Sequence, residues 1–242
     1  MNPIVEEALR AHAIDHYPTE CCGFVLRIDG CDVYRPARNA AQSRRDHFVI
    51  HPEDRAKAED DGEIVAIVHS HPQYAATPSE ADRVMCEISD LEWHIVHVSR
   101  DPDTLVVSTG EIVSFRPSGY VAPLRGRSFS HGVLDCYTLI QDYYKRELGI
   151  ELPHFERDDL WWEKGQNLYL DNLKAAGFEP IEGPMQQNDV IIMQVRAKVP
   201  NHAGVYMGNG LILHHVMDRL STLDVYDGYW QRATRVVVRR KS

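Results

Sequence analysis

The chain has 242 residues, of which 43% are hydrophobic and 26% are charged, a composition that is typical of folded globular proteins and excludes a mainly disordered chain. Its formal net charge of −10 argues against a nucleic-acid or membrane partner, because both need a basic surface. No apolar run is long enough to cross a bilayer, and the N-terminus lacks a signal-peptide pattern, so we expect synthesis as a soluble cytoplasmic protein. The five cysteines lack framework spacing and favour free thiols, whereas 13 histidines direct attention to metal or acid–base chemistry.

The first half of the chain predicts a mixed α/β domain. Apolar residues between Ile4 and His12 recur at helical spacing, and this helix should end before Pro18. Two apolar runs joined by Asp29-Gly30 predict a β-hairpin, and the apolar run at 64–68 predicts a buried central strand. The other elements expected in this half are a short strand at 48–50, helices at 52–61 and 79–88, and strands at 93–98 and 105–107.

A stretch rich in Pro, Gly and polar residues at 115–127 predicts a boundary, which divides the chain into domains 1–118 and 119–242. Beyond it, apolar residues from Cys136 to Tyr144 at helical spacing predict a buried helix. A second helix is expected at 165–176, and strands are expected at 190–195, 203–207, 211–214 and 236–238. The second half is therefore expected to be α+β, with its helices first.

His69 and His71 stand at the end of the predicted central strand, and Asp82 lies in the first turn of the next predicted helix. Residues i and i+2 of an extended segment point the same way, so both imidazoles can reach one ion while Asp82 supplies an oxygen. Three protein ligands leave a position open, as in catalytic zinc sites. The alternative is that the histidines are surface turn residues and that Ser79 is only a helix cap, although capping is compatible with a catalytic role.

The pattern His-X-His-Pro, followed by Ser and then Asp three residues later, resembles that of the JAMM/MPN metallopeptidases, zinc enzymes that cut peptide and isopeptide bonds. The resemblance covers about residues 1–115 and implies a JAMM/MPN-like (cytidine-deaminase-like) mixed sheet with flanking helices. It also implies a set of functional residues, namely the zinc ligands His69, His71 and Asp82, the general base Glu20, and Ser79 as hydrogen-bond donor to the developing oxyanion.

A second candidate site is formed by Cys136, in the first turn of a predicted helix that Asp135 can cap. The partial positive charge of a helix start favours the thiolate, so we expect a lowered thiol pKa. His202 begins a predicted strand and His214 ends the next one across a tight hairpin, so that one imidazole can orient the other. The alternative is that Cys136 is a buried core thiol and His202 a strand-end residue, while His215 competes with His214 for the third position.

The Asp-Cys pair at a helix start and the segment 202–214 resemble the NlpC-type cysteine peptidases, papain-like enzymes that cleave peptidoglycan stem peptides. The resemblance covers about residues 120–242 and implies a papain-like α+β domain. Tyr137-Thr138 stand where the family commonly has Ser-Gly, so the groove beside the nucleophile is expected to be narrower or to read a different peptide. The implied catalytic residues are the nucleophile Cys136, the base His202 and the orienting residue His214.

The two halves in this order resemble the tail-tip assembly proteins of long, flexible-tailed bacteriophages. This resemblance implies a wall-cleaving peptidase with a second, zinc-dependent site, and leaves two alternatives: a protease that processes a tail protein, and a non-catalytic assembly adaptor. The implied substrate is peptidoglycan, and the implied partners are other tail-tip proteins, one of them with a ubiquitin-like region. The implied location is the host cytoplasm during assembly, and then the virion tail tip.

Overall fold

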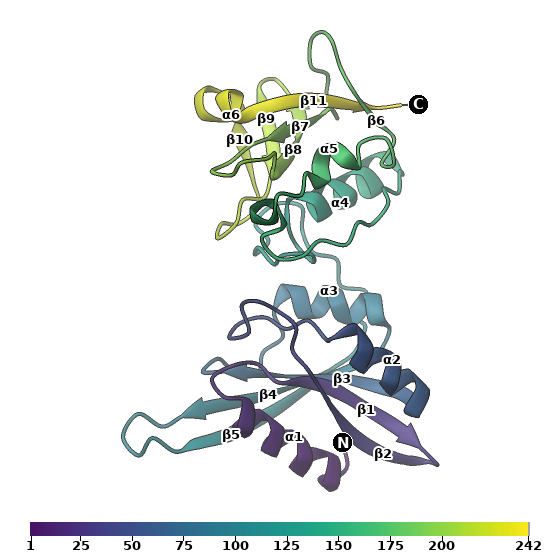
Figure 1. The fold of residues 1–242 in the computed structure, drawn as a ribbon, viewed down its shortest axis with the longest axis vertical. Coiled ribbons are helices and arrows are strands. Elements are labelled where there is room, and N and C mark those ends of the chain that lie inside the picture. The colour runs from purple at the N-terminus through teal and green to yellow at the C-terminus, as the bar shows by residue number, and fades with distance from the viewer. Residues whose placement is uncertain (242) are drawn as a thin grey trace. The chain divides into compact units, whose positions relative to one another are not determined.

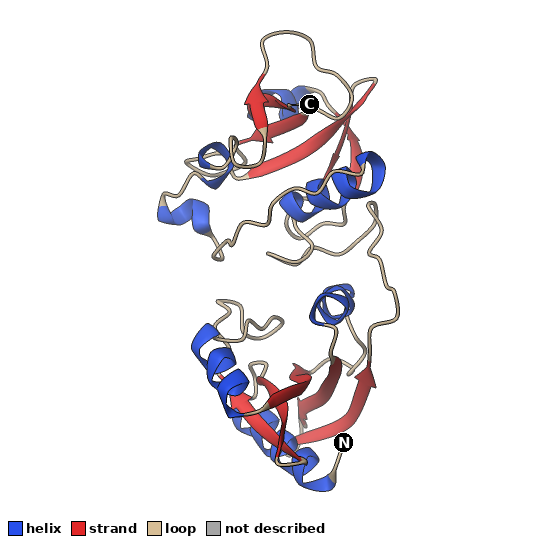
Figure 2. Cartoon of the chain, turned by 90° about the vertical axis from the view of Figure 1, so that its right-hand side faces the viewer, coloured by secondary structure: helices blue, strands red, loops and turns tan. Residues whose placement is uncertain are grey.

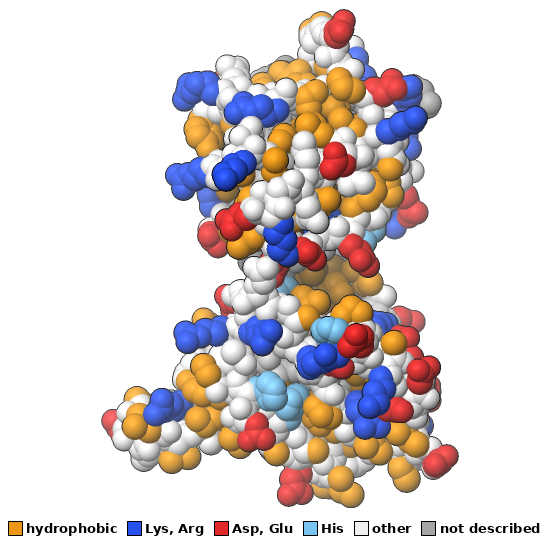
Figure 3. All heavy atoms as spheres, viewed as in Figure 1, with side chains coloured by type: hydrophobic (Ala, Val, Ile, Leu, Met, Phe, Trp, Pro, Cys, Tyr) orange, Lys and Arg blue, Asp and Glu red, His pale blue; other side chains and the backbone are white. Residues whose placement is uncertain are grey.

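The computed structural model of the chain describes residues 1–241 and divides into two compact units, Met1–Val121 (unit 1) and Ala122–Ser242 (unit 2). Across the described residues, no helix is both long and apolar enough to cross a membrane. Acidic and basic side chains are intermixed on the face of each unit that Figure 3 shows.

Unit 1 is built on a mixed sheet with the strand order β2-β1-β3-β4-β5. Strands β3 and β4 are parallel and the other neighbours are antiparallel. Its elements are α1 (Pro3–His16), β1 (Cys22–Ile28), β2 (Cys31–Ala37), α2 (Pro52–Asp61), β3 (Glu63–Pro72), α3 (Glu80–Ser89), β4 (Glu92–Arg100) and β5 (Val107–Phe115).

The sheet of unit 1 is covered on both faces (Figure 1). Val5 and Leu9 of α1 pack on one face with Val68 of β3, and Ala58 of α2 packs on the other face with Ile67. Alternating residues of β3 therefore enter opposite cores, as expected for a central strand that is buried on both sides. The mixed α/β prediction for this half is confirmed.

Two expected strands of unit 1 are wrong in extent. Residues 48–50 contribute only an isolated bridge between Ile50 and Asn39. The strand expected at 105–107 runs from Val107 to Phe115, because Asp101 accepts hydrogen bonds from the backbone of Asp103 and Thr104 and so folds the preceding segment into a turn. The polar residues that alternate along β5 conceal its length in the sequence.

Unit 2 consists of a sheet with the strand order β10-β9-β8-β7-β11-β6 and all neighbours antiparallel. Helix α4 packs on one face through Leu139, Ile140 and Tyr143, and Tyr226 and Ala233 contribute to a second cluster with Ile191. Its elements are α4 (Cys136–Leu148), the 3-10 helix η1 (Trp161–Lys164), α5 (Leu168–Asp171), β6 (Phe178–Pro180), β7 (Val190–Met193), β8 (His202–Gly208), β9 (Leu211–His214), β10 (Thr222–Val225), α6 (Gly228–Ala233) and β11 (Thr234–Arg240). Figure 2 shows the helices and strands of this unit, which confirm the α+β prediction.

The helix expected at 165–176 is wrong in length, since only α5 is helical and turns follow it. The side-chain amide of Asn172 donates to the Leu168 carbonyl at 2.9 Å, a local bond that competes with continued helix. The short elements β6, β10 and α6 were not expected, because three to six residues carry too little periodic pattern to be recognised.

Candidate active sites

The candidate metal centre of unit 1 is assembled by the end of β3 and the first turn of α3, beside the segment that precedes β1. His69 and His71 lie two residues apart on β3 and point to the same face, where the ring of His69 stacks on Phe48 with centroids 4.5 Å apart. Cys22 at the start of β1 pairs with His69. Glu20, two residues before Cys22, is therefore close to this end of β3. Asp82 comes from the first turn of α3.

The donor atoms of these side chains converge. The two Nε2 atoms of His69 and His71 lie 3.1 Å apart, and the carboxylate oxygens of Asp82 lie 3.3 Å from His69 Nε2 and 3.6 Å from His71 Nε2. The Nδ1–H of His71 donates to the Ala75 carbonyl at 2.8 Å, which leaves its Nε2 lone pair directed at the group. Two imidazole nitrogens and a carboxylate that face one another in this way fit a shared cation such as zinc.

Ser79 and Glu20 complete this group. The Ser79 hydroxyl oxygen accepts from the Asp82 backbone N–H at 3.1 Å, while the Ser79 N–H donates to the Asp82 carboxylate at 2.8 Å, so both form a capping box at the start of α3. Ser79 therefore caps the helix, and its hydroxyl hydrogen remains for another acceptor. Glu20 is buried, and this burial, with the negative charge of Asp82, raises the pKa of its carboxyl to about 9.

In unit 2, Cys136 is the first residue of α4 and Asp135 is its N-cap. The Asp135 carboxylate accepts from the backbone N–H groups of Tyr137 and Thr138, both at 2.9 Å, and forms a buried ion pair with Arg157 at 2.9 Å. Arg157 also lies over the Tyr137 ring, 5.1 Å from its centroid. The helix start that carries the thiol is thus held by an ion pair with a segment 22 residues further along the chain.

The environment of the thiol differs from the expectation in one respect. Cys136 Sγ forms a hydrogen bond with the Tyr169 hydroxyl at 3.1 Å, and the backbone N–H of Ala203, next to His202, is a further partner. Burial and the negative charge of Asp135 raise the thiol pKa to about 11, against the effects of Tyr169, Ala203 and Arg157. The expected lowered pKa is therefore wrong: desolvation outweighs the helix start, and the resting group is a neutral thiol.

The two histidines form a relay that ends on a carboxylate. His202 Nε2 lies 3.0 Å from His214 Nδ1, and His214 Nε2 lies 3.1 Å from Asp224 on β10. Because Asp224 can only accept, His214 donates through Nε2–H, its Nδ1 accepts from His202 Nε2–H, and His202 Nδ1 is left with a free lone pair. This assignment needs both rings neutral, and burial lowers the pKa of both, that of His202 to about 3. Gly204 pairs with His214, and a Cβ there would lie only 2.8 Å from the Cβ of His214.

Sequence reasoning missed three residues of this site: Asp224, Tyr169 and Arg157. Asp224 lies on the unexpected strand β10, and no fixed spacing links Tyr169 or Arg157 to Cys136. His215, the competitor for the third position, instead donates to the Arg219 carbonyl at 3.1 Å and lies against Phe129.

Comparison with known proteins identifies both units. Residues 3–113 match the family model of prokaryotic homologs of the JAB domain, and residues 126–239 match the NlpC/P60 family. A solved Staphylococcus aureus protein of the NLP/P60 family, described as similar to a lipoprotein, is 20% identical, with a TM-score of 0.34 over 48% of this chain and 37% of that one. The chain thus joins a JAB-homologous domain to an NlpC/P60 domain.

Over its whole length the chain is similar to named phage proteins. It is 40% identical over 237 residues to tail tip assembly protein K of Escherichia phage N15, covering 97% of this chain and 93% of that protein. It is 45% identical over 192 residues to tail tip assembly protein K of Escherichia phage lambda, covering 79% and 89%. The chain belongs to the tail tip assembly protein K family.

The buried His202 predicts a loss of stability in acid. Its pKa is about 3 in the folded chain against 6.5 when unfolded, so its contribution is complete above pH 6.5 and is lost as the pH falls from 6.5 towards 3. Each such group changes the free energy of unfolding by up to about 1.4 kcal/mol per pH unit. We expect the urea midpoint, followed by tryptophan fluorescence, to fall between pH 7 and pH 5, and to fall less steeply in His202→Asn. Equal slopes in both proteins would contradict this assignment.

Tyr169 predicts a change in the reactivity of Cys136. Its hydroxyl is a donor for the thiolate, so Tyr169→Phe should move the alkylation of Cys136 by iodoacetamide to higher pH, by about one unit for the loss of one hydrogen bond to a charged group. The exposed Cys31 should react before Cys136 in both proteins. Tyr137→Phe is the matched control, because that hydroxyl donates to the Pro153 carbonyl. An unchanged profile for Tyr169→Phe would show that the hydroxyl does not act on the sulfur.

Proposed function

We propose that the chain acts in phage tail-tip assembly and carries two hydrolase sites. Unit 2 is a cysteine endopeptidase that cleaves peptidoglycan stem peptides during penetration of the host wall, and unit 1 is a zinc-dependent peptidase or isopeptidase. The domains are 1–118 and 119–242. The observation that carries this proposal is the relay from Asp224 through His214 to His202, whose chain neighbour Ala203 contacts the thiol of Cys136 at a helix start through its backbone N–H.

In unit 2 the proton of the thiol is removed as the reaction begins. His202 accepts it at Nδ1, the lone pair that the relay keeps free, and Cys136 Sγ attacks the carbonyl carbon of the scissile bond. The positive charge on His202 is shared with His214 and opposed by Asp224. The Tyr169 hydroxyl and the Ala203 N–H donate to the sulfur while it is negative. His202 then returns the proton to the leaving amine as the C–N bond breaks. Water, which gives a proton to His202, hydrolyses the remaining thioester, and the acid product leaves as His202 returns that proton to the sulfur.

In unit 1 the ligands would be His69, His71 and Asp82. A bound zinc ion would supply Lewis acidity for peptide hydrolysis. Glu20 would be the base: a cation held by the neighbouring ligands would favour the ionised form of this buried carboxyl against the burial that raises its pKa to about 9, and the carboxylate could then accept and return a proton. The free hydroxyl hydrogen of Ser79 would donate to the substrate oxygen.

The relatives are named for assembly of the tail tip, which supports other tail-tip proteins as partners and a location that changes from host cytoplasm to virion tail. We expect a tail protein with a ubiquitin-like region to bind residues 1–118, as JAMM/MPN relatives act on such folds. Co-purification with each half of the chain tests this expectation. Binding that maps to 119–242 alone would contradict it.

The function is tested by incubating the purified protein with peptidoglycan and, separately, with tail proteins, and by identifying new ends by mass spectrometry. We expect stem-peptide fragments from peptidoglycan, absent in Cys136→Ala and retained in Glu20→Gln. Cleavage of a tail protein alone would identify a processing protease instead. Absence of any cleavage, with tail assembly restored by Cys136→Ala in infected cells, would identify an adaptor.

A further inference from the structure

A polar hollow of about 610 Å³ lies in unit 2 outside the groups described so far. Two loop segments form it, one before α4 and one before β10, and its lining residues are Arg125, Gly126, Arg219, Leu220, Ser221 and Thr222. Backbone hydrogen bonds join the segments, from Gly126 N–H to the Ser221 carbonyl at 2.8 Å and from Ser221 N–H to the Arg127 carbonyl at 3.1 Å. The hollow is therefore built by paired backbone rather than by loose loops.

Within residues 122–241, the two arginines of the hollow share with Arg196, Arg232, Arg235 and Arg240 the lack of an ion pair, and they are the two that line this hollow. Arg127, Arg157 and Arg239 each form an ion pair with an aspartate. Within residues 1–241, Arg125 and Arg219 have no carboxylate in ion-pair distance, although the chain carries a net charge of −10. Two exposed guanidinium groups that line one polar hollow without an internal counter-ion are suited to bind an anion from outside.

The hollow lies beside the catalytic relay. Thr222 pairs with His214 across β9 and β10, and its hydroxyl lies 3.4 Å from the Asp224 carboxylate. The positive charge of Arg219 acts on His214, where it adds to burial in lowering the pKa of the ring. An anion held by Arg219 is thus held next to the residues that activate the thiol.

The position of the hollow relative to the nucleophile is also fixed. Arg127, which follows Arg125 and Gly126, is fully buried and its guanidinium contacts Asp142 and Thr138 on α4, the helix that begins with Cys136. The Arg127 N–H donates to the Ser221 hydroxyl at 3.2 Å. The segment is thereby tied both to the nucleophile helix and to the start of β10.

We propose that Arg125 and Arg219 form a subsite for a carboxylate of the peptide substrate. The proposal rests on the peptidase function of unit 2 and specifies its substrate: a peptide with a free carboxylate near the scissile bond, in preference to the amidated form. Guanidinium groups match the planar, two-oxygen geometry of a carboxylate, and amidation removes both its charge and one acceptor.

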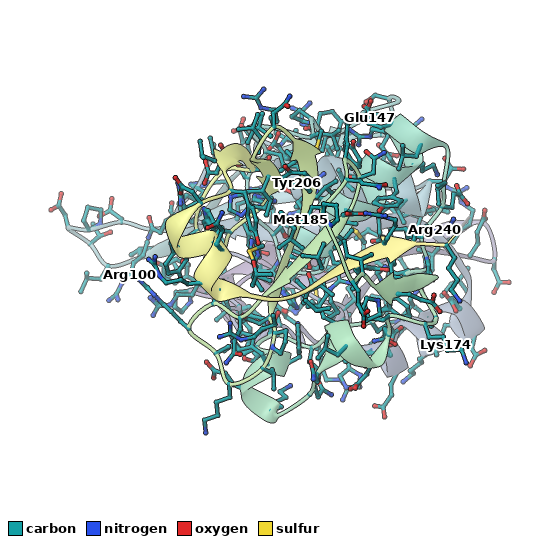
Figure 4. All side chains as sticks on the ribbon, turned by 90° about the horizontal axis from the view of Figure 1, so that it is seen from above. Arg100, Glu147, Lys174, Met185, Tyr206 and Arg240 are labelled. Carbon is teal, nitrogen blue, oxygen red and sulfur yellow. The ribbon has the colours of Figure 1, made fainter. Side chains whose placement is uncertain are left out.

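The test measures binding in the full-length Cys136→Ala protein, so that no cleavage is needed. Isothermal titration compares the peptidoglycan stem tetrapeptide with its fully amidated counterpart. We expect about ten-fold tighter binding of the free peptide, the effect of two exposed ion pairs. The double variant Arg125→Gln/Arg219→Gln should bind the free and the amidated peptide with equal affinity. Lys174→Gln, which removes one charge from an exposed side chain at the edge of the unit (Figure 4), should leave it unchanged.

Three results would overturn the subsite. The first is equal affinity of the protein for the free and the amidated peptide. The second is that Lys174→Gln removes the preference for the free peptide as fully as the double arginine variant does. The third is displacement of the free peptide by equimolar inorganic phosphate, which would assign the hollow to phosphate. If Cys136→Ala prefers the free peptide but the wild-type protein cleaves no peptide, the peptidase function is refuted and the subsite is not. Failure of the subsite and failure of the peptidase function are therefore distinguishable.

Discussion

Cys136→Ala should abolish cleavage of peptide substrate by unit 2, and changes along the relay should have graded effects. His202→Ala removes the proton acceptor and should lower kcat/KM by about 10³–10⁴-fold. His214→Ala and Asp224→Asn leave the acceptor in place but release its orientation, so each should cost about 10–100-fold. Kinetics with a defined stem peptide, after zinc removal to silence unit 1, measure this ranking.

The double variant His214→Ala/Asp224→Asn makes this prediction sharper. Asp224 reaches His202 only through His214, so the double change should cost no more than His214→Ala. Additive losses would mean that Asp224 acts by another route. Cys31→Ala is the thiol control, because that side chain is exposed on β2 in unit 1, and it should retain full activity. Stem-peptide cleavage by Cys136→Ala would refute the nucleophile assignment.

Local spacing was sufficient to find the residues that short segments bring together. His69 and His71 share a face because they are two residues apart on a strand, and Asp82 follows through one helix start. His202 and His214 meet because a tight hairpin pairs β8 with β9. In these cases the periodicity of the sequence is enough to specify the geometry.

Tertiary structure supplied what spacing could not. Asp224 reaches His214 only because the four-residue strand β10 adds to the edge of the sheet. Tyr169 reaches Cys136 from a segment whose expected helix is mostly turns. The thiol pKa was predicted with the wrong sign, because the helix start is a local feature of the sequence whereas desolvation depends on all the elements packed around the sulfur.

His69→Ala should reduce zinc binding by unit 1 far below one ion per chain. Loss of a partner that only orients a ligand costs about 10–100-fold in metal affinity, so loss of a direct ligand should cost more than about 100-fold. Equilibrium dialysis followed by elemental analysis measures this change. His94→Gln is the matched control, because His94 is also buried, lies on the neighbouring strand β4 and bonds to the Ser114 hydroxyl at 2.8 Å. Full zinc occupancy in His69→Ala would refute the ligand set.

Asp82 needs a separate comparison, because it also caps α3. Asp82→Asn keeps a side-chain oxygen for the Ser79 N–H but loses the charge, so zinc affinity should fall while the zinc-free protein keeps most of its stability. Ser79→Ala removes the acceptor of the Asp82 N–H and should lower the zinc-free stability by about 1 kcal/mol, with little loss of zinc. Zinc that binds only the folded state raises the unfolding temperature of the wild-type protein. This zinc-dependent rise should vanish in Asp82→Asn and persist in Ser79→Ala. The reverse pattern would mean that Asp82 is a helix cap and not a ligand.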